Sequence, residues 1–154
     1  MSDSVQAKLA ELGLTLPEAT APVANYVPYV RTGNLLHVSG QVAIRDGKLV
    51  EGRLGDTMTV EDGAKAAELC ALSLLAQVNA ACDGDLGKLV RVVKLVGFVN
   101  STAEFGDQPK VINGASDLMV NVLGDKGRHA RSAVSAAALP FGVAVEIEGV
   151  FELA

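Results

Sequence analysis

The length of 154 residues predicts one domain, residues 1–154, with enough chain to bury a core. Hydrophobic residues make up 49% of the sequence but aromatic residues only 4%, so we expect a core of alanine, valine and leucine. The net charge of −5 and the scarcity of aromatic side chains disfavour nucleic-acid binding. That function usually depends on a basic surface and on aromatic faces that stack with bases.

The N-terminal segment is polar and has the pattern of a short helix. Residues 4–12 are expected to be helical, and three prolines between residues 17 and 28 make the next stretch a connecting arm. The helix and arm together occupy residues 1–27. The segment lacks the apolar centre of a signal peptide, and charged side chains interrupt the most apolar stretch, residues 64–82. Neither a secretion signal nor a membrane span is therefore expected.

The two cysteines indicate a reducing environment. Cys70 and Cys82 lie in one predicted helix, which holds them about 18 Å apart at a rise of about 1.5 Å per residue. A disulfide needs Cα atoms within about 7 Å of each other, so the two cannot pair. Two unpaired thiols favour a cytoplasmic protein, and both cysteines are expected in the core because neither has a basic neighbour in the sequence.

Strand patterns begin at Tyr29. The segments 29–31 and 35–42 are predicted to be strands separated by a turn, and Asp46-Gly47 has the positive-φ preference of a second hairpin turn. Side chains alternate along a strand, so residues 35–42 should present an apolar face and a more polar row. The polar row is predicted to contain Leu35, His37, Ser39 and Gln41.

Two longer helices flank a buried strand. Residues 59–82 are predicted to be helical, with Thr59 as the cap and an acid three residues later. Residues 88–99, rich in valine and leucine, follow as a strand. Residues 109–123 have proline in the first turn and glycine directly after the end, which predicts the second helix. A glycine-rich loop over residues 124–128 comes next.

The C-terminal stretch is predicted to be a β-hairpin. A strand of small residues opens with Arg131, residues 139–142 break it, and residues 145–153 alternate strictly. One face of the last strand carries Val145, Ile147, Gly149, Phe151 and Leu153, and the other carries Glu146, Glu148, Val150 and Glu152.

The order of elements predicts an α+β fold, in which a mixed sheet has two helices packed on one face, plus the N-terminal helix. Such an arrangement leaves the other face of the sheet bare. Because the chain is rich in apolar residues, we expect another subunit to cover that face.

Motifs for metal and nucleotide cofactors are absent. His37 and His129 stand far apart without ligand-type spacing, and the sequence contains no P-loop, no G-x-G-x-x-G and no G-x-S-x-G motif. We therefore expect no metal site and no cofactor. The remaining candidates are polar groups on strand faces and near the second helix, namely Arg131, Glu146 or Glu148, Ser39 with Gly40, Tyr29 and Asn113.

Arg131 is the central candidate because small residues follow it in the sequence. A guanidinium with room in front of it can take a carboxylate in a two-pronged hydrogen bond. It could instead form a surface ion pair with one of the late glutamates, which would contribute little. Glu146 and Glu148 could likewise occupy the solvent face of an edge strand.

Four stretches of the sequence resemble the RidA/YjgF family of reactive imine/enamine deaminases, and together they cover residues 28–151. The matching segments are Val38-Ser39-Gly40-Gln41, Val92-Val93-Lys94 with Phe98-Val99 and Phe105, Asn113 near the start of the second helix, and Ala130-Arg131-Ser132-Ala133-Val134 with Leu139-Pro140 and Val145-Glu146-Ile147-Glu148. The last of these resembles the C-terminal signature of the family and is the most specific.

The resemblance implies a chorismate-mutase-like fold and a homotrimer with clefts between subunits. It also implies hydrolytic deamination of enamine or imine intermediates such as 2-aminoacrylate to 2-oxo acids and ammonium, without a cofactor. Arg131 would hold the substrate carboxylate, and Glu146 would position or activate the attacking water. The residues implied to line the cleft are Tyr29, Ser39, Gly40 and Asn113. A protonated imine is already electrophilic, so catalysis needs mainly orientation and a proton acceptor for water.

Some features depart from the family pattern. His129 stands where the family usually has proline, Ala133 stands where many members have cysteine, and a short insertion separates Phe105 from Asn113. With the extra N-terminal helix, these features resemble a longer, less characterised branch of the family. Two other functions stay open. One is a non-catalytic protein that binds a 2-oxo acid or amino acid through the same arginine, and the other is an endoribonuclease.

Overall fold

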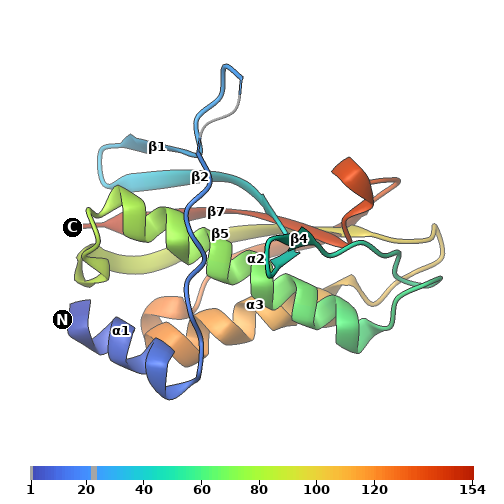
Figure 1. Ribbon diagram of the computed structural model, residues 1–154, viewed down its shortest axis with the longest axis horizontal. Coiled ribbons are helices and arrows are strands. Elements are labelled where there is room, and N and C mark those ends of the chain that lie inside the picture. Colours follow the sequence, from blue (N-terminus) through green and yellow to red (C-terminus); the bar gives the residue numbers. More distant parts are fainter. Residues whose placement is uncertain (1, 22–23) are drawn as a thin grey trace.

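The structure is a computed structural model that describes residues 2–21 and 24–154, and it consists of a five-stranded sheet with helices on one face (Figure 1). The sheet contains, in spatial order, β1 (Tyr29–Thr32), β2 (Leu35–Val42), β7 (Val145–Leu153), β5 (Leu89–Asn100) and β6 (Ala130–Ala136). β5 and β6 are parallel, and the other neighbours are antiparallel. A separate small hairpin joins β3 (Ile44–Arg45) to β4 (Lys48–Leu49) through Asp46 and Gly47, as predicted.

Two long helices, α2 (Val60–Ala81) and α3 (Gln108–Leu123), pack against each other on the same face of the sheet, and α1 (Ser2–Glu11) lies beside α3. The connections include three 3-10 turns, η1 (Leu86–Lys88), η2 (Gly124–Gly127) and η3 (Pro140–Gly142). The predicted α+β fold is confirmed, and the glycine-rich loop after α3 takes the form of η2. None of the helices in the described part of the chain has the length and apolar character needed to cross a membrane.

α2 begins where the sequence predicts. Oγ1 of Thr59 accepts a hydrogen bond from the backbone N–H of Asp62 at 3.2 Å, and the acidic side chains of Glu61 and Asp62 complement the helix dipole. At the other end, Asp83 and Gly84 have φ angles of 54° and 85°. These positive angles turn the chain out of the helix towards β5.

α2 and α3 approach closely at Gly114. A Cβ atom at this position would overlap the carbonyl oxygen of Ala64, so only glycine allows the two helix backbones to meet here. Gly114 follows Asn113 directly and lies two residues before Ser116. The close contact therefore also determines where these two polar side chains stand relative to the sheet.

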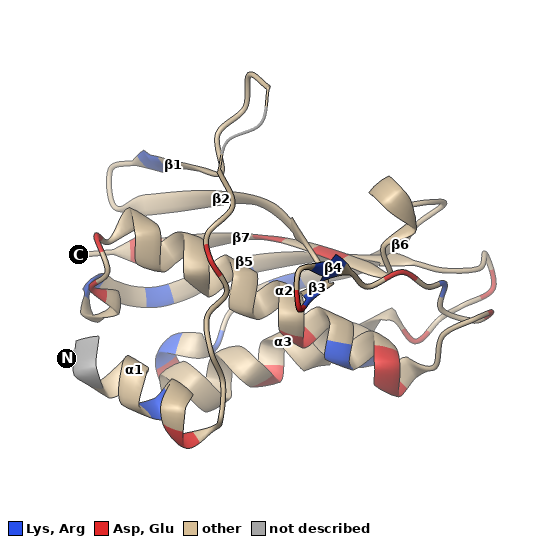
Figure 2. Ribbon diagram, viewed as in Figure 1, with Lys and Arg blue, Asp and Glu red and all other residues tan. Residues whose placement is uncertain are grey.

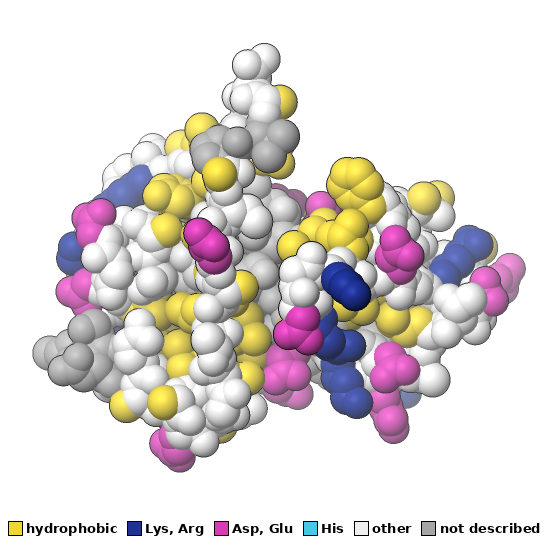
Figure 3. Space-filling model, in the orientation of Figure 1, with side chains coloured by type: hydrophobic (Ala, Val, Ile, Leu, Met, Phe, Trp, Pro, Cys, Tyr) yellow, Lys and Arg dark blue, Asp and Glu magenta, His cyan; other side chains and the backbone are white. Residues whose placement is uncertain are grey.

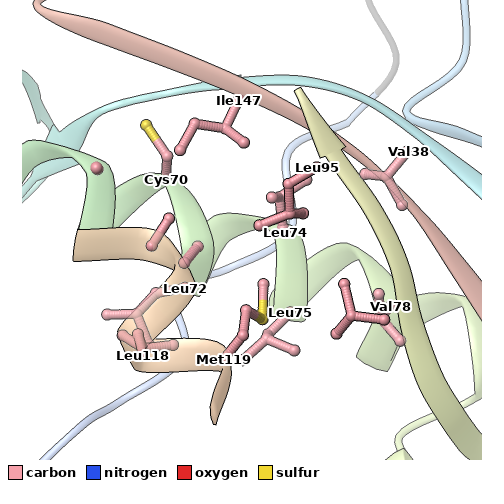
Figure 4. Packing of buried hydrophobic residues seen from close by; sticks show 14 of the residues in the cluster. Val38, Cys70, Leu72, Leu74, Leu75, Val78, Leu95, Leu118, Met119 and Ile147 are labelled. Carbon is pink, nitrogen blue, oxygen red and sulfur yellow. The ribbon is translucent and has the colours of Figure 1, made fainter. Parts of the chain in front are cut away.

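The core lies between the helices and the sheet and consists largely of the small aliphatic residues expected from the composition (Figure 4). Buried side chains labelled in the figure include Cys70, Leu74, Leu75 and Val78 from α2, Met119 from α3, and Val38, Leu95 and Ile147 from the sheet. Cys70 and Cys82 are both free and buried, as predicted, and burial raises the pKa of the Cys70 thiol. Both cysteines are structural rather than reactive groups.

The predicted C-terminal hairpin is wrong. β5 lies between β6 and β7, pairing in parallel with the first and antiparallel with the second. α3 forms a crossover from β5, which brings the chain back parallel to β5 at the edge of the sheet. η3 then sends the chain past β5 to its far side. β7 buries every second side chain and suits the centre of the sheet, whereas the small, partly exposed side chains of β6 suit an edge.

The predicted division of β2 into an apolar face and a polar row holds only for its first half. Leu36 and Val38 are buried as expected, but the pairing of β2 with β7 shifts between Val38 and Gln41, which marks a β-bulge. After the bulge the faces are reversed, so Gln41 is buried and Gly40 is exposed. The prediction failed because a single extra residue in a strand exchanges its two faces.

No α-helix in the described part of the chain covers the face of the sheet turned away from α2 and α3 (Figure 1). Apolar side chains are exposed there. Val30 and Val134 are 54% and 45% exposed, and Leu35 is 38% exposed.

Candidate active site

Polar side chains of α3 and β6 form a hydrogen-bonded network. Arg131, the second residue of β6, pairs with Leu95 of β5, which is fully buried beneath the helices. Arg131 therefore points to the helix-covered side of the sheet. There NH1 donates to Oδ1 of Asn113 at 2.8 Å and to Oγ of Ser116 at 3.1 Å. Asn113 and Ser116 are three residues apart on α3 and share one face of it.

His129 extends this hydrogen-bonded network. Its Nδ1 lies 2.6 Å from the carbonyl oxygen of Gly127, and its Nε2 lies 2.9 Å from Oγ of Ser116. A carbonyl only accepts, so we assign the ring proton to Nδ1, and Nε2 of the neutral ring then accepts from the Ser116 hydroxyl. Burial, together with the nearby charge of Arg131, lowers the pKa of His129, which favours this neutral form.

Sequence reasoning included Arg131 and Asn113 among the site residues but missed Ser116 and His129 as their partners. Two signals were present. Ser116 follows Asn113 at the spacing of one helix face, and His129 lies two residues before Arg131, as alternate residues of an extended segment do.

Arg131 retains donor groups for a ligand. Neither Nε nor NH2 has a hydrogen-bond partner among the described residues, since both bonds to α3 come from NH1. No ion pair within the described part of the chain includes Arg131 either, so the alternative of a pair with a late glutamate is not realised there. Nε and NH2 form the flat edge of the guanidinium that binds a carboxylate through two parallel hydrogen bonds.

Ser39, Gly40 and Glu146 come together on the wall of a cavity of about 640 Å³. The cavity lies where β1 no longer covers the edge of β2. The Ser39 backbone N–H and hydroxyl donate to the carbonyl oxygens of Pro28 and Val27, at 2.8 and 2.9 Å, and hold the end of the N-terminal arm against β2.

Gly40 makes room for the carboxyl group of Glu146. A Cβ atom at Gly40 would lie 3.0 Å from Cδ and 3.1 Å from Oε1 of Glu146, which is closer than ordinary packing allows. Burial and, to a smaller extent, the charge of Glu148 raise the pKa of Glu146. A carboxylate with a raised pKa is a better proton acceptor than a freely solvated one.

Tyr29 does not belong to this cavity. It pairs with Val38, whose side chain is buried, and it packs against the hydrophobic core. Tyr26, which was not among the predicted site residues, lines the cavity instead and is 59% exposed.

Within one chain, Arg131 and Glu146 lie on opposite faces of the sheet. In β5, Leu95 pairs with Arg131, and Phe98 pairs with Glu146. Leu95 and Phe98 are three positions apart with no register shift between them, so their side chains and those of their partners point to opposite faces. A single chain therefore does not bring together the two groups that were expected to share a cleft.

Charged side chains of both signs are interspersed along the ribbon (Figure 2). Within residues 2–21 and 24–154, no three histidine, cysteine, aspartate or glutamate side chains gather in a way that could hold a metal ion. On one face of the sheet, the Arg131 guanidinium can bind a carboxylate, and we call this group the Arg131 clamp. On the other face, the carboxyl group of Glu146 can accept a proton.

Comparisons with known proteins place this geometry in a family. Residues 6–150 match the family model described as "YjgF/chorismate mutase-like, putative endoribonuclease". The chain is 51% identical to the protein TCP17 of Trypanosoma cruzi, over 99% of this chain and 96% of that protein. It is 31% identical to the protein HMF1 of Saccharomyces cerevisiae, over 86% of this chain and 87% of the relative.

Solved structures agree. The protein Atu1372 of Agrobacterium tumefaciens, a protein of unknown function, superposes with a TM-score of 0.93 at 52% identity, covering 99% of this chain and 94% of its own. RidA from an Antarctic Psychrobacter superposes with a TM-score of 0.59 at 29% identity, covering 88% of this chain and 94% of its own. A family match that runs from residue 6 to residue 150, supported by such relatives, shows that the chain belongs to the RidA/YjgF family with its chorismate-mutase-like fold.

Proposed function

We propose that the protein hydrolyses reactive enamine and imine intermediates similar to 2-aminoacrylate, releasing a 2-oxo acid and ammonium. The observation that carries this proposal is the state of Arg131. Asn113 and Ser116 hold its NH1, while Nε and NH2, which have no hydrogen-bond partner among residues 2–21 and 24–154, can bind a carboxylate. The substrates of this reaction are carboxylates that need to be held in one orientation.

The reaction needs few protein groups. The enamine takes up a proton at carbon to become the imine. Once the imine nitrogen is protonated, water attacks the imine carbon. Glu146 accepts a proton from that water, and the resulting carbinolamine collapses to the 2-oxo acid as its nitrogen leaves as ammonia, which is protonated to ammonium. The raised pKa of Glu146 supports its role as base, and binding through Arg131 supplies orientation.

The proposed site combines two subunits. Because one chain places Arg131 and Glu146 on opposite faces of the sheet, we propose that the clamp of one chain meets the Glu146 cavity of another. A homotrimer with clefts between its subunits would satisfy this requirement. The exposed apolar side chains on the bare face of the sheet, including Val30 and Val134, support such an association.

The direct test is ammonium release from an imino acid generated freshly in the assay by an L-amino acid oxidase. Wild type should accelerate the release, and Arg131→Ala should lose most of this acceleration. Arg128→Ala is the matched control, because the Arg128 side chain is 70% exposed and forms its ion pair with the fully exposed Asp125. A wild type that performs no better than buffer across a broad panel of imino acids contradicts the proposal.

A second candidate is a protein that binds a 2-oxo acid or amino acid without turnover, since the Arg131 clamp would serve it equally. Retained binding in Glu146→Gln, with no turnover in wild type, would favour this function.

The family description also contains the words "putative endoribonuclease". The net charge of −5 argues against that activity. Cleavage of single-stranded RNA by purified wild type, lost in Arg131→Ala, would support it.

A further inference from the structure

The cavity beside Glu146 has a wall that the N-terminal arm supplies. Residues 17–21 of the arm face the exposed edge of β2 across the cavity, with α2 at its base and η3 at its mouth. Figure 3 shows the surface hollowed between the projecting N-terminal segment and the lobe beside it. The volume of about 640 Å³ falls within the range of small-molecule sites.

The arm is attached to the helix layer by a buried amide. Gln77 of α2 is only 1% exposed, and its Nε2 donates to Oγ1 of Thr20 at 2.9 Å and, more weakly, to the Thr20 carbonyl oxygen at 3.4 Å. A buried amide group is costly unless it is hydrogen-bonded, so Gln77 holds the arm at this point. The wall of the cavity is therefore fixed to the helix layer by hydrogen bonds.

The chemistry of the lining favours apolar groups. Small and apolar side chains predominate, including Ala19, Ala21, Val42, Ile44 and Pro140, and the described residues that line the cavity include neither lysine nor arginine. The carboxylate of a substrate thus meets no cationic side chain among these lining residues, which favours its binding at the Arg131 clamp.

Phe141 stands at the mouth of the cavity with an unusual backbone. It lines the cavity, is 77% exposed and has a φ angle of 60°, in the left-handed region that bulky residues rarely adopt. Gly142 follows it in the same region, with a φ angle of 72°. This turn presents an aromatic ring where an apolar ligand would enter.

We propose that this cavity receives the side chain of the substrate, and that the preferred substrates are imino and enamino acids with large apolar side chains. This inference rests on the proposed function and names the substrate class of the same site. The side chain of 2-aminoacrylate is a single methylene group. The cavity, by contrast, offers the space of about twenty water molecules at about 30 Å³ each, enough for a branched or aromatic side chain.

The test uses 2-oxo acids, the products of the proposed reaction, as binding probes. Calorimetry measures the Kd of pyruvate, 4-methyl-2-oxopentanoate and phenylpyruvate with wild type and with two variants that fill the cavity from different walls, Ala19→Phe and Val42→Phe. Ala103→Phe is the control, because Ala103 is exposed in a loop outside the cavity. Ammonium release from the imino acids of alanine, leucine and phenylalanine is measured in parallel.

Wild type and Ala103→Phe should bind phenylpyruvate at least about tenfold more tightly than pyruvate, as expected for added apolar groups in a fitted pocket. Either filling variant should reduce this ratio towards one, because it weakens the binding of phenylpyruvate more than that of pyruvate. Equal affinities in wild type, no binding of any 2-oxo acid, or a ratio that survives both filling variants would overturn the inference.

The parallel assay separates this inference from the proposed function. Selective binding that responds to Ala19→Phe, without ammonium release from any imino acid, rejects the deaminase and keeps the apolar cavity. Ammonium release that is equally efficient for the imino acids of alanine and phenylalanine, and indifferent to both filling variants, keeps the deaminase and rejects the cavity as a substrate pocket.

Discussion

The hydroxyl of Ser116 lies 2.9 Å from Nε2 of His129, and the same oxygen accepts a hydrogen bond from Arg131 at 3.1 Å. One helix side chain thereby joins a neutral histidine to the guanidinium of the proposed clamp. The geometry makes His129 a positioning residue for Arg131, acting through Ser116.

His129→Leu should weaken binding of 2-oxo acids by about tenfold, because the Ser116 hydroxyl loses its acceptor and no longer holds NH1 of Arg131 in one direction. His129→Gln should restore much of the affinity, since its amide oxygen can replace Nε2 as acceptor. Calorimetric Kd values for the two variants and wild type check this. Equal affinity in His129→Leu and wild type would show that Ser116 does not need the histidine.

The lowered pKa of His129 predicts a loss of stability in mild acid. The unfolded chain takes up a proton at the ordinary value of 6.5 and the folded protein only at lower pH, so stability is complete above pH 6.5 and falls as the pH drops below it. The groups that surround the ring are the Arg131 guanidinium, the Ser116 hydroxyl and the Gly127 carbonyl. Thermal melts between pH 5 and 8 should show a smaller acid loss in His129→Gln than in wild type, and parallel curves would contradict the assignment.

Glu146→Gln should lower kcat by about a hundredfold or more, because the amide cannot accept the proton of the attacking water. Although this substitution should reduce activity, it should increase the stability of the fold at neutral pH. The folded protein binds a proton at Glu146 more readily than the unfolded chain, whose ordinary value is 4.5, so this group destabilises the fold increasingly as the pH rises through its raised pKa.

The Tm of Glu146→Gln should therefore exceed that of wild type by about 1–2 °C at pH 7 and converge with it below pH 4.5. Glu152→Gln, a change of the same kind on the same strand, is the control and should leave both kcat and this pH dependence unaltered. A Glu146→Gln variant with full activity would remove the carboxyl group from the mechanism.

Mixing two inactive variants tests whether the site is shared between chains. Arg131→Ala and Glu146→Gln subunits, unfolded and refolded together in equal amounts, should recover about a quarter of wild-type activity, since about one interface in four then pairs an intact arginine with an intact glutamate. The measurement is ammonium release from the refolded mixture, with each variant refolded alone as the control. If both groups acted within one chain, the mixture would stay as inactive as its components.

Gly114→Ala should destabilise the fold by about 1–3 kcal/mol, because its Cβ would overlap the Ala64 carbonyl oxygen and force α2 and α3 apart. Thermal unfolding should show a Tm several degrees below wild type. Gly106→Ala is the matched control, since a Cβ there meets no heavy atom within 4 Å and the backbone is not in the left-handed region. Similar Tm values for the two variants would show that α2 and α3 can accommodate the extra methyl group.

Features that depend on neighbours along the chain were predictable. The Thr59 cap of α2, the Asp46-Gly47 turn and the alternation of β7 are all present as expected. They follow from local hydrogen bonds, local backbone preferences and the two-residue period of a strand. The two cysteines are likewise buried, as expected from the absence of basic neighbours in the sequence.

The predicted hairpin failed because strand pairing is a long-range choice. Nothing in the residues between β6 and β7 reveals that β5 lies between them, and the crossover through α3 decides it. The bulge in β2 was equally hidden, although it places Gly40 against Glu146.

The sequence by itself determined the helices, most strand segments and the choice of Arg131 and Glu146 as residues of the proposed site. Tertiary structure alone decided that Ser116 and His129 hold Arg131, that Gln77 attaches the arm over a cavity, and that Arg131 and Glu146 face opposite ways. The physical reason is the range of the interactions. Helix and turn formation depends on contacts a few residues apart, whereas Gln77 meets Thr20 across 57 residues of chain, and only the packed fold brings such groups within hydrogen-bonding distance.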